Sequence, residues 1–237
     1  MSDLDHLLDL QANDTHADQI RHRRDTLPER AALVDLDARR AALEAAAAEP
    51  RARREELGRE QKRLEDEVAS VEEKVAHVDH QLYGGGVTSP KEAQALQADL
   101  ESLKRRQSQL EDQVLEVMEQ LEPLDAELED HASALAALVE ERAGLEAALA
   151  EGEAAADAEL AEVEAARAGL VAQVPAPLLA EYERLRPMMG GVAVAKLQGT
   201  TCQGCFLSLA SAEVDEIRRQ PADAVIHCPD CGRLLVR

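Results

Sequence analysis

The chain has 237 residues, and although 45% of them are hydrophobic it contains no Trp, one Phe and two Tyr. Aromatic side chains therefore cannot dominate any core, and the abundance of Ala, Leu, Glu and Arg is typical of long helices and coiled coils. The formal net charge of −22 argues against a general affinity of the whole molecule for nucleic acid or anionic membranes. Most of this charge lies on residues 111–170, which contain 2 Lys+Arg and 18 Asp+Glu.

The N-terminal residues are acidic and lack the basic and apolar regions of a signal peptide. No apolar run approaches the roughly 20 residues that a membrane-spanning helix needs. We therefore expect a cytoplasmic protein with no membrane partner. In a reducing compartment, cysteines at paired spacing indicate metal ligands before disulfides.

Hydrophobic residues recur in steps of three and four along two stretches. One such seam runs from Leu57 to Leu82, and a longer one runs from Leu96 to Leu149. A sustained pattern of this kind predicts a coiled-coil seam rather than the wider stripe of a globular helix. Polar residues interrupt the second seam at three positions, Gln107, His131 and Arg142.

Three consecutive glycines lie between the two seams and end the first helix, because each glycine costs about 1 kcal/mol in a helix interior. Ser89 then suits an N-cap, Pro90 the first helical position and Glu92 a capping box. Such a short connection makes the two helices antiparallel neighbours. The tip is either a plain turn or a partner-binding site formed by Tyr83, Gly84, Gly85 and Gly86.

Helix breakers on the two arms are predicted to lie at the same levels. Reflection of the chain through the tip places Pro50 opposite Pro123, and Pro28 almost opposite Gly144. The segment 26–29 also resembles a capping box at which the first arm restarts. We therefore expect the hairpin to bend at two levels, although chance in a chain with nine prolines explains the same coincidence.

Beyond residue 171 the pattern changes. Two prolines break the long helix, and a short amphipathic helix follows from Leu178 to Arg186, where Pro187 ends it. A hinge-like Gly190-Gly191 pair then leads to residues 192–197, which have the character of a strand.

The C-terminal segment contains two Cys-x2-Cys pairs separated by 22 residues. Two residues between cysteines let both sulfurs of one knuckle face a common point, and two knuckles close a tetrahedron around one structural Zn²⁺. We expect a short helix packing Val214 and Ile217 on this ribbon. Phe206, Leu207 and Leu209 are expected to form its small core rather than a ligand surface. The predicted zinc ligands are Cys202, Cys205, Cys228 and Cys231.

These observations predict a mainly α fold: a long, kinked antiparallel helical hairpin (coiled coil) plus a small C-terminal β zinc ribbon. The hairpin is expected over residues 1–171 with its tip at 83–90, the short helix and linker over 172–191, and the C4 ribbon over 192–237. The sequence leaves open whether the chain is a monomer or a homodimer.

The tip segment, from Leu82 to Glu92, and the last knuckle, Cys228-Pro229-Asp230-Cys231-Gly232, resemble those of the bacterial C4-type zinc-ribbon coiled-coil family. Its members include a Helicobacter flagellar regulator and a chlamydial protein associated with a sigma factor and secretion. The resemblance implies adaptor functions: binding an alternative sigma factor, secretion or flagellar components, and in one branch messenger RNA. The architecture transfers to this chain better than the particular partners do.

The sequence can be compared with three classes of function. The first is a non-enzymatic adaptor that mediates protein–protein interactions and has a regulatory role. Its acidic face either binds a basic partner or is simply solvated. The second is an RNA-binding post-transcriptional regulator that acts through the ribbon, with Tyr182 and Phe206 as the nearby aromatics. An enzyme is disfavoured because no nucleophile–base pair or phosphate loop stands out, and we expect no small-molecule substrate. The candidate RNA contacts are Arg218, Arg219, Arg233 and Arg237.

Overall fold

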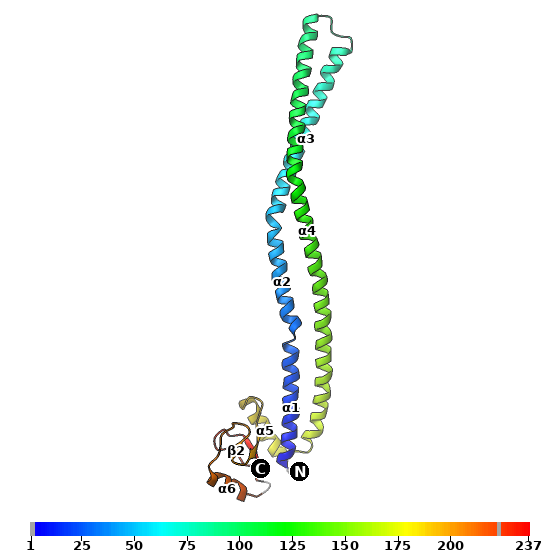
Figure 1. Cartoon of the computed structure of the whole chain (residues 1–237). Helices are drawn as coiled ribbons and strands as arrows, with labels where there is room; N and C mark the ends of the chain where they lie inside the picture. The colour runs from blue at the N-terminus through cyan, green and yellow to red at the C-terminus, as the bar shows by residue number, and fades with distance from the viewer. Residues whose placement is uncertain (1–2, 222–223) are drawn as a thin grey trace. The chain divides into compact units, whose positions relative to one another are not determined.

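The protein is described by a computed structural model that covers residues 3–221 and 224–237 (Figure 1). The chain forms two compact units: the ribbon unit, Met1–Ala31 with Leu145–Arg237, and the hairpin unit, Ala32–Gly144. The elements in chain order are α1 (Asp3–Asp25), α2 (Pro28–Ala46), α3 (Ala48–Tyr83), α4 (Pro90–Val171), α5 (Ala176–Met188), β1 (Val194–Gln198), β2 (Thr201–Cys202), α6 (Ser211–Arg219) and β3 (Leu234–Val236).

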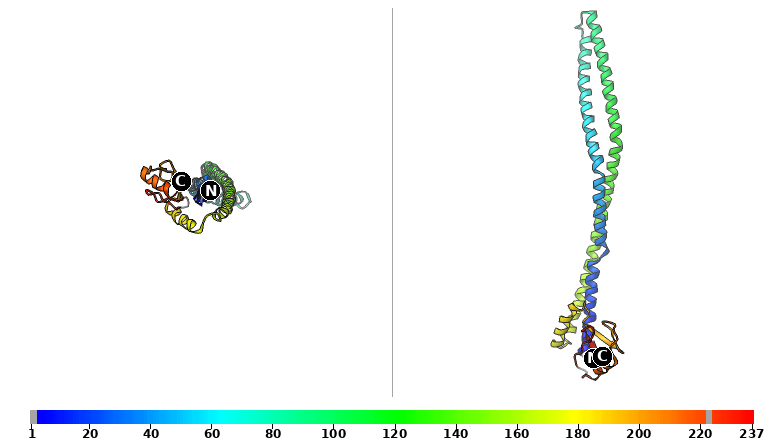
Figure 2. Two further views of the ribbon diagram at one scale, coloured as in Figure 1. Left: turned by 90° about the horizontal axis from the view of Figure 1, so that it is seen from below. Right: turned by 90° about the vertical axis from the view of Figure 1, so that its left-hand side faces the viewer.

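In the hairpin unit, α3 and the first part of α4 run side by side from the turn that joins them (Figure 2). Every seam position of α4 from Leu96 to Leu149 is buried or half-buried, and every position between them is exposed. Leu57 and Leu64 of α3 pack with Leu110 and Leu121 of α4 in one apolar cluster. The predicted seam is thus confirmed, and it stabilises the unit by removing one apolar stripe of each helix from water.

Polar residues in the seam are satisfied across the hairpin unit rather than left buried alone. The Arg142 guanidinium pairs with Asp37, and the Gln107 amide donates to Glu72 at 3.2 Å. A buried polar group without a partner would cost about 1–3 kcal/mol, so these cross-helix contacts explain how the seam tolerates its interruptions.

The first arm is interrupted at both predicted places, but the chemistry differs from the prediction. The expected capping box at residues 26–29 is wrong, because the Thr26 hydroxyl donates back to the His22 carbonyl at 2.7 Å. Pro50 lies in the first turn of α3, where its missing N–H leaves no intrahelical bond unmade. The first arm therefore restarts at Pro28 and at Ala48.

In the second arm, the helix breakers at the two levels of the expected bends do not end the helix. Helix α4 continues through Pro123 and Gly144 without interruption. In the predicted register Arg54 would lie opposite Glu119, yet its guanidinium donates to Asp125 at 2.9 Å. At the level of Pro50 and Pro123 the first arm is interrupted and the second arm is a continuous helix.

In the ribbon unit, α1 lies beside the last part of α4 (Figure 1), where Ala17 and Ile20 pack against Ala156 and Val163. A second apolar cluster joins two helices to the sheet. Its buried members are Leu4, Leu7, Leu10, Val174, Leu178, Tyr182, Leu185, Ala193, Val194, Leu234 and Val236. One core thus holds α1, α5 and the sheet together.

The sheet has the strand order β2-β1-β3, with β1 antiparallel to β2 and parallel to β3. The Gln11 side chain of α1 pairs with β1: its amide donates to the Val194 carbonyl at 2.7 Å and accepts from the Val194 N–H at 2.6 Å. This contact reproduces the two hydrogen bonds that a neighbouring strand would make.

The predicted fold class, a mainly α hairpin followed by a small β module, is confirmed.

Two local expectations about the linker need correction. Helix α5 extends through Pro187 to Met188 instead of ending at Arg186. The Gly190-Gly191 pair is an ordered helix terminus, because the Gly191 N–H donates to the Arg186 carbonyl at 2.9 Å, the closing bond of a Schellman-type cap. The compact units group the elements differently from the three predicted parts, and those domain boundaries stay a prediction.

A buried carboxylate joins α1, α4 and α5 in the ribbon unit. Asp14 is 3% exposed and accepts from the Arg167 Nε at 2.6 Å and the Tyr182 hydroxyl at 2.8 Å. The Arg186 side chain donates to the Asp14 carbonyl at 3.1 Å and pairs with Asp18. Burial, and then the hydrogen bond to Asp14, raise the pKa of Tyr182. Every oxygen of the Asp14 carboxylate therefore has a donor, as a buried charge requires.

Candidate metal centre and interaction surfaces

The two cysteine pairs form closely similar turns. In the first, the Phe206 N–H donates to the Cys202 carbonyl at 2.8 Å, and in the second, the Gly232 N–H donates to the Cys228 carbonyl at 2.8 Å. Each turn ends in a residue of positive φ, 59° at Phe206 and 76° at Gly232. The local backbone thus brings both sulfurs of each pair to the same side.

Close packing beneath the first turn requires a glycine. A Cβ atom on Gly204 would lie 2.5 Å from Cδ of Arg233 and 2.9 Å from Cβ of Ala195. Both distances are shorter than carbon–carbon contact allows. Gly204 therefore lets the first turn approach β1 and the chain that leaves the second turn.

The four thiols gather at one point. The sulfurs of Cys202, Cys205, Cys228 and Cys231 all lie within 4.8 Å of one another, and Cys205 Sγ is 4.0 Å from Cys228 Sγ. A tetrahedron with Zn–S bonds of about 2.3 Å has edges of about 3.8 Å, so the sulfur positions fit one zinc ion. Four protein ligands complete the coordination, which makes the site structural.

The acidity of these thiols follows from their surroundings. Burial raises the pKa of the Cys228 thiol to about 12, so a cation is needed to hold its thiolate at neutral pH. Burial also opposes ionisation of Cys231, but the Arg233 backbone N–H and guanidinium donate to its sulfur, and the pKa falls to about 7. Zinc supplies the missing positive charge when it is bound, which couples folding of this module to the metal.

The first turn presents apolar side chains to solvent. Phe206 is 73% exposed and Leu207 is 53% exposed, whereas Leu209 is 5% exposed. The expectation that all three form the ribbon core is therefore wrong for two of them. The ribbon core contains Val214 and Ile217 of α6, as predicted. Its other buried members are Ala195, Cys202, Leu209, Ile226, Cys228 and Leu235.

The sequence itself contains a signal for the unusual position of Phe206. The two knuckles read Cys-Gln-Gly-Cys-Phe and Cys-Pro-Asp-Cys-Gly, so Phe206 takes the place that Gly232 has in the second knuckle. A bulky residue at a position that favours glycine indicates a constraint other than local folding.

Three of the four arginines proposed to contact RNA bind the protein's own backbone. Arg237 donates to the carbonyls of Ile217 and Gln220, each at 2.8 Å, and also to that of Pro221, where it caps the end of α6. Arg233 donates to the Val192 carbonyl at 2.7 Å, and Arg218 to that of Gly199 at 3.4 Å. Arg219 is exposed and has no such bond in the part of the chain that the structure describes. The four side chains therefore do not form one free cationic patch.

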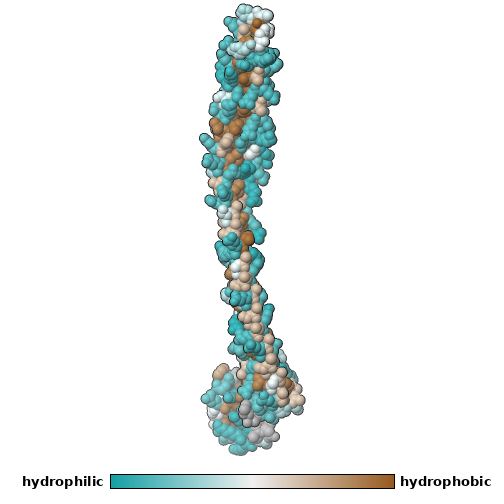
Figure 3. Space-filling view, turned by 90° about the vertical axis from the view of Figure 1, so that its right-hand side faces the viewer, coloured by the Kyte–Doolittle hydropathy of each residue, from teal (hydrophilic) through white to brown (hydrophobic). Residues whose placement is uncertain are grey.

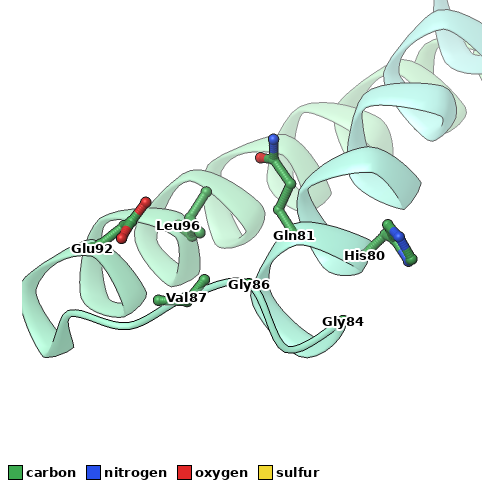
Figure 4. A pocket seen from close by; sticks show the side chains of 7 residues that line it. All are labelled: His80, Gln81, Gly84, Gly86, Val87, Glu92 and Leu96. Atoms are coloured by element: carbon green, nitrogen blue, oxygen red, sulfur yellow. The ribbon is translucent and has the colours of Figure 1, made fainter.

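At the hairpin tip, Tyr83 is exposed, and the same turn contains a hollow of about 370 Å³. His80 and Gln81 of α3, Val87 of the loop, and Glu92 and Leu96 of α4 line this hollow, with Gly84 and Gly86 (Figure 4). A Cβ atom on Gly84 would lie 2.4 Å from the His80 carbonyl oxygen, and Gly85 has a φ of 85°. These two glycines serve the turn itself, while Gly86 has open space around it.

Comparisons with known proteins cover the chain almost completely. The CT398-like coiled coil hairpin domain matches residues 10–190, and the C4-type zinc ribbon domain matches residues 201–235. An uncharacterized protein of Mycobacterium tuberculosis is 35% identical over 231 residues, which are 98% of this chain and 94% of that protein. The two matched families are typically non-enzymatic, and the C4-type zinc ribbon together with the four gathered thiols is consistent with one structural zinc.

Solved structures share the fold. A protein from Mycobacterium smegmatis superposes with a TM-score of 0.86 and 28% identity, covering all of both chains. CT398 from Chlamydia trachomatis gives 0.66 and 19% identity, and the HP0958 protein from Helicobacter pylori gives 0.53 and 18%. Each of these two matches covers 98% of this chain and 96% of the other. Within residues 3–221 and 224–237, no helix combines the length and apolarity needed to cross a membrane.

Proposed function

Because the chain belongs to the family with the CT398-like coiled-coil hairpin, and carries a C4-type zinc ribbon, we propose that it is a non-enzymatic adaptor. In this proposal it binds other proteins in the cytoplasm and serves a regulatory role. The zinc site supports the absence of catalysis, since four thiolates leave no coordination position for a substrate or an activated water.

The observation that carries this proposal is the exposed Phe206. A left-handed backbone at a non-glycine residue costs about 1–2 kcal/mol, and the equivalent position of the second knuckle uses Gly232. No burial of the aromatic ring offsets this cost, because the Phe206 side chain lies in solvent next to that of Leu207. A strained and exposed aromatic on a rigid metal-held turn has the properties of a binding anchor.

The hairpin tip is the second proposed contact. Tyr83 is exposed on a turn built by Gly84 and Gly85, with Gly86 at the edge of the neighbouring hollow. Tyrosine is enriched in protein interfaces because one end is apolar and the other makes hydrogen bonds. We propose that these four residues contact a partner in addition to forming the turn.

RNA binding is the second candidate function, and Phe206 is also the observation that favours it. An exposed aromatic ring can stack on an unpaired base, worth about 1–3 kcal/mol. Tyr182 gives no such support because it is fully buried against Asp14. The backbone contacts of Arg218, Arg233 and Arg237 reduce the number of cations left for phosphate, so we place this function second.

A glycine substitution separates binding from folding at this position. Phe206→Gly should preserve zinc binding and raise the stability of the ribbon by up to about 1 kcal/mol, because glycine adopts positive φ without strain. The tagged wild type and variant would be cross-linked in native cells and purified with and without ribonuclease, and co-purifying proteins identified.

The adaptor proposal predicts a set of proteins that survives ribonuclease with the wild type and is lost with Phe206→Gly. If the set disappears with ribonuclease, RNA is the primary ligand and Arg219→Ala becomes the next variant. Retention of every partner by a correctly folded Phe206→Gly protein would contradict the role given to this knuckle.

A further inference from the structure

A second surface of the molecule lies far from the zinc knuckle in sequence, on the hairpin unit. A groove of about 350 Å³ runs between α3 and α4, and its apolar lining comes from Val68 and Ala69 on one side and Val114 and Leu115 on the other. Leu115 is 57% exposed, and Met118, one turn along α4, is 47% exposed. Leu115 and Met118 lie just outside the seam and are absent from the apolar cluster that holds the hairpin together, whereas Val68 and Val114 pack against that cluster and show only part of their surface to the groove.

The rim of this groove is acidic, and its acids have no cationic partners among the described residues. Glu65, Glu72 and Glu111 line it. The contacts made by their carboxylates are with neutral amides: Gln61 donates to Glu65, while Gln107 donates to both Glu72 and Glu111. Glu67, by contrast, pairs with two arginines. The rim therefore keeps its negative charge available.

The surroundings add to this charge. No Lys or Arg occurs in α4 between Arg106 and Arg142, whereas Asp112, Glu116, Glu119 and Glu122 lie within that stretch. On the face shown in Figure 3, hydrophobic side chains gather in a stripe with hydrophilic side chains on both sides, in the upper part of the view. An apolar groove between two helices, with acidic borders, is complementary to an apolar stripe with basic borders.

We propose that this groove binds a cationic amphipathic helix of a partner protein. Its apolar side chains, spaced three and four residues apart, would pack on Val68, Val114 and Leu115 as a third helix packs on a pair. Its Lys and Arg side chains would face Glu65, Glu72 and Glu111. A symmetric contact between two copies would instead set each acidic rim against the other, which like-charge repulsion opposes. This surface is independent of the Phe206 knuckle.

The probe is a labelled peptide of about 18 residues made of Leu and Lys, with Leu at helical spacing on one face. Its binding to the full-length, zinc-loaded protein would be followed by fluorescence anisotropy. A scrambled peptide of the same composition keeps the charge but has no apolar face. The test variant is Leu115→Glu with Met118→Glu, and each substitution lies on an exposed position, so the fold should persist by circular dichroism.

The control variant introduces the same kind of change on the same helix, away from the groove. Val139 is 62% exposed and apolar, so Val139→Glu adds negative charge without touching the lining. The proposal predicts at least about ten-fold weaker binding for the double variant and for the scrambled peptide. Val139→Glu should change the affinity by less than about two-fold, and raised salt should weaken the wild-type complex.

Three outcomes would overturn the proposal. The first is no binding of the patterned peptide, and the second is equal binding of both peptides, which would mean attraction by charge alone. The third is a concentration-dependent sedimentation of the wild type that Leu115→Glu removes, which would identify a second copy as the occupant. Phe206→Gly should leave peptide binding unchanged, so failure here and failure of the proposed adaptor function can be told apart.

Discussion

The two units of this protein are stabilised in different ways. In the hairpin unit, α3 and α4 bury a repeating row of Leu and Val, and their cross-helix ion pairs, such as Arg54 with Asp125, lie in solvent. In the ribbon unit, single residues make unique contacts: Asp14 holds two helices through Arg167 and Tyr182, and four thiols form one metal site. Repeated contacts share the stabilisation among many residues, whereas unique contacts concentrate it in a few.

This difference has a physical basis. An exposed ion pair contributes about 0–1 kcal/mol because water already solvates both charges. A buried charge that loses its partner costs about 3–5 kcal/mol, since water cannot replace the missing contact. A structural zinc site contributes more still, because the metal organises a segment too small to fold on its own core. Substitutions of equal size should therefore have unequal effects in the two units.

Loss of the metal should have the largest effect. Cys228→Ser removes a buried ligand and should lower the zinc content to near zero and unfold residues 192–237. Most of the helical signal should remain, because the hairpin seam does not depend on zinc. Zinc stoichiometry and far-UV circular dichroism test this. Retention of one zinc would mean that the ligand set is mis-assigned, and collapse of the helical signal would contradict the distinction between the units.

Removal of the buried carboxylate should have a smaller effect than loss of the metal. Asp14→Ala leaves the buried Tyr182 hydroxyl without its acceptor and removes one of the two carboxylates that pair with Arg167, and should destabilise the ribbon unit by about 2–3 kcal/mol. Urea unfolding measures the change. Asp125→Ala is the matched control, since its partner Arg54 is half exposed, and should cost less than about 1 kcal/mol. Equal losses of stability would contradict the difference between the two units.

Within the hairpin unit, the seam itself can be tested with two leucines of α4. Leu110 is 1% exposed, so Leu110→Ala should cost about 2–5 kcal/mol through lost burial and the cavity left behind. Leu115→Ala changes the same residue type five positions later, where the side chain is largely in solvent, and should stay within about 0.5 kcal/mol. Thermal unfolding of the two variants measures the two losses of stability. Similar losses would mean that burial in the seam is not what stabilises the hairpin.

The smallest predicted effect is alkaline destabilisation through Tyr182. Its pKa is raised in the folded protein, above the usual value near 10 of an unfolded chain, first by burial and then by its bond to Asp14. This contribution is complete below about pH 10 and is lost as the pH rises above it, by up to about 1.4 kcal/mol per unit. Tyr182→Phe should show a shallower fall in stability from about pH 10 to 11. Parallel curves for the two proteins would assign the alkaline loss to other groups.

The hairpin could be predicted closely from the sequence because its information is periodic. Steps of three and four identified every buried position of the seam, and the tip glycines located the turn between Tyr83 and Pro90. Pro123 deletes one intrahelical hydrogen bond but does not interrupt α4, whose Leu121 and Leu124 pack on the hairpin cluster on either side of it. Helix breakers predict an interruption, and tertiary contacts decide whether it occurs.

The ribbon unit was predicted in outline and missed in detail. Cysteine spacing is a strong signal, and the zinc site was found. The partners of Asp14 lie more than 150 residues away in sequence, so no local pattern reveals them. Asp14 lies between Leu10 and Ala17 on the buried stripe of α1. A charged residue at such a position is the one feature of the sequence that indicates a buried partner. Phe206 was expected in the core because it is apolar, yet the backbone turn directs it outward.

Hydrogen–deuterium exchange of the full-length protein, before and after zinc chelation, tests the contrast between the units most directly. Chelation should remove protection from residues 192–237 and lower it in α1, whose Leu4, Leu7 and Leu10 pack on the sheet. Protection across the seam of α3 and α4, from Leu57 to Leu121, should not change. Loss of protection along that seam would contradict the account, because it would mean that the hairpin and the ribbon are stabilised together.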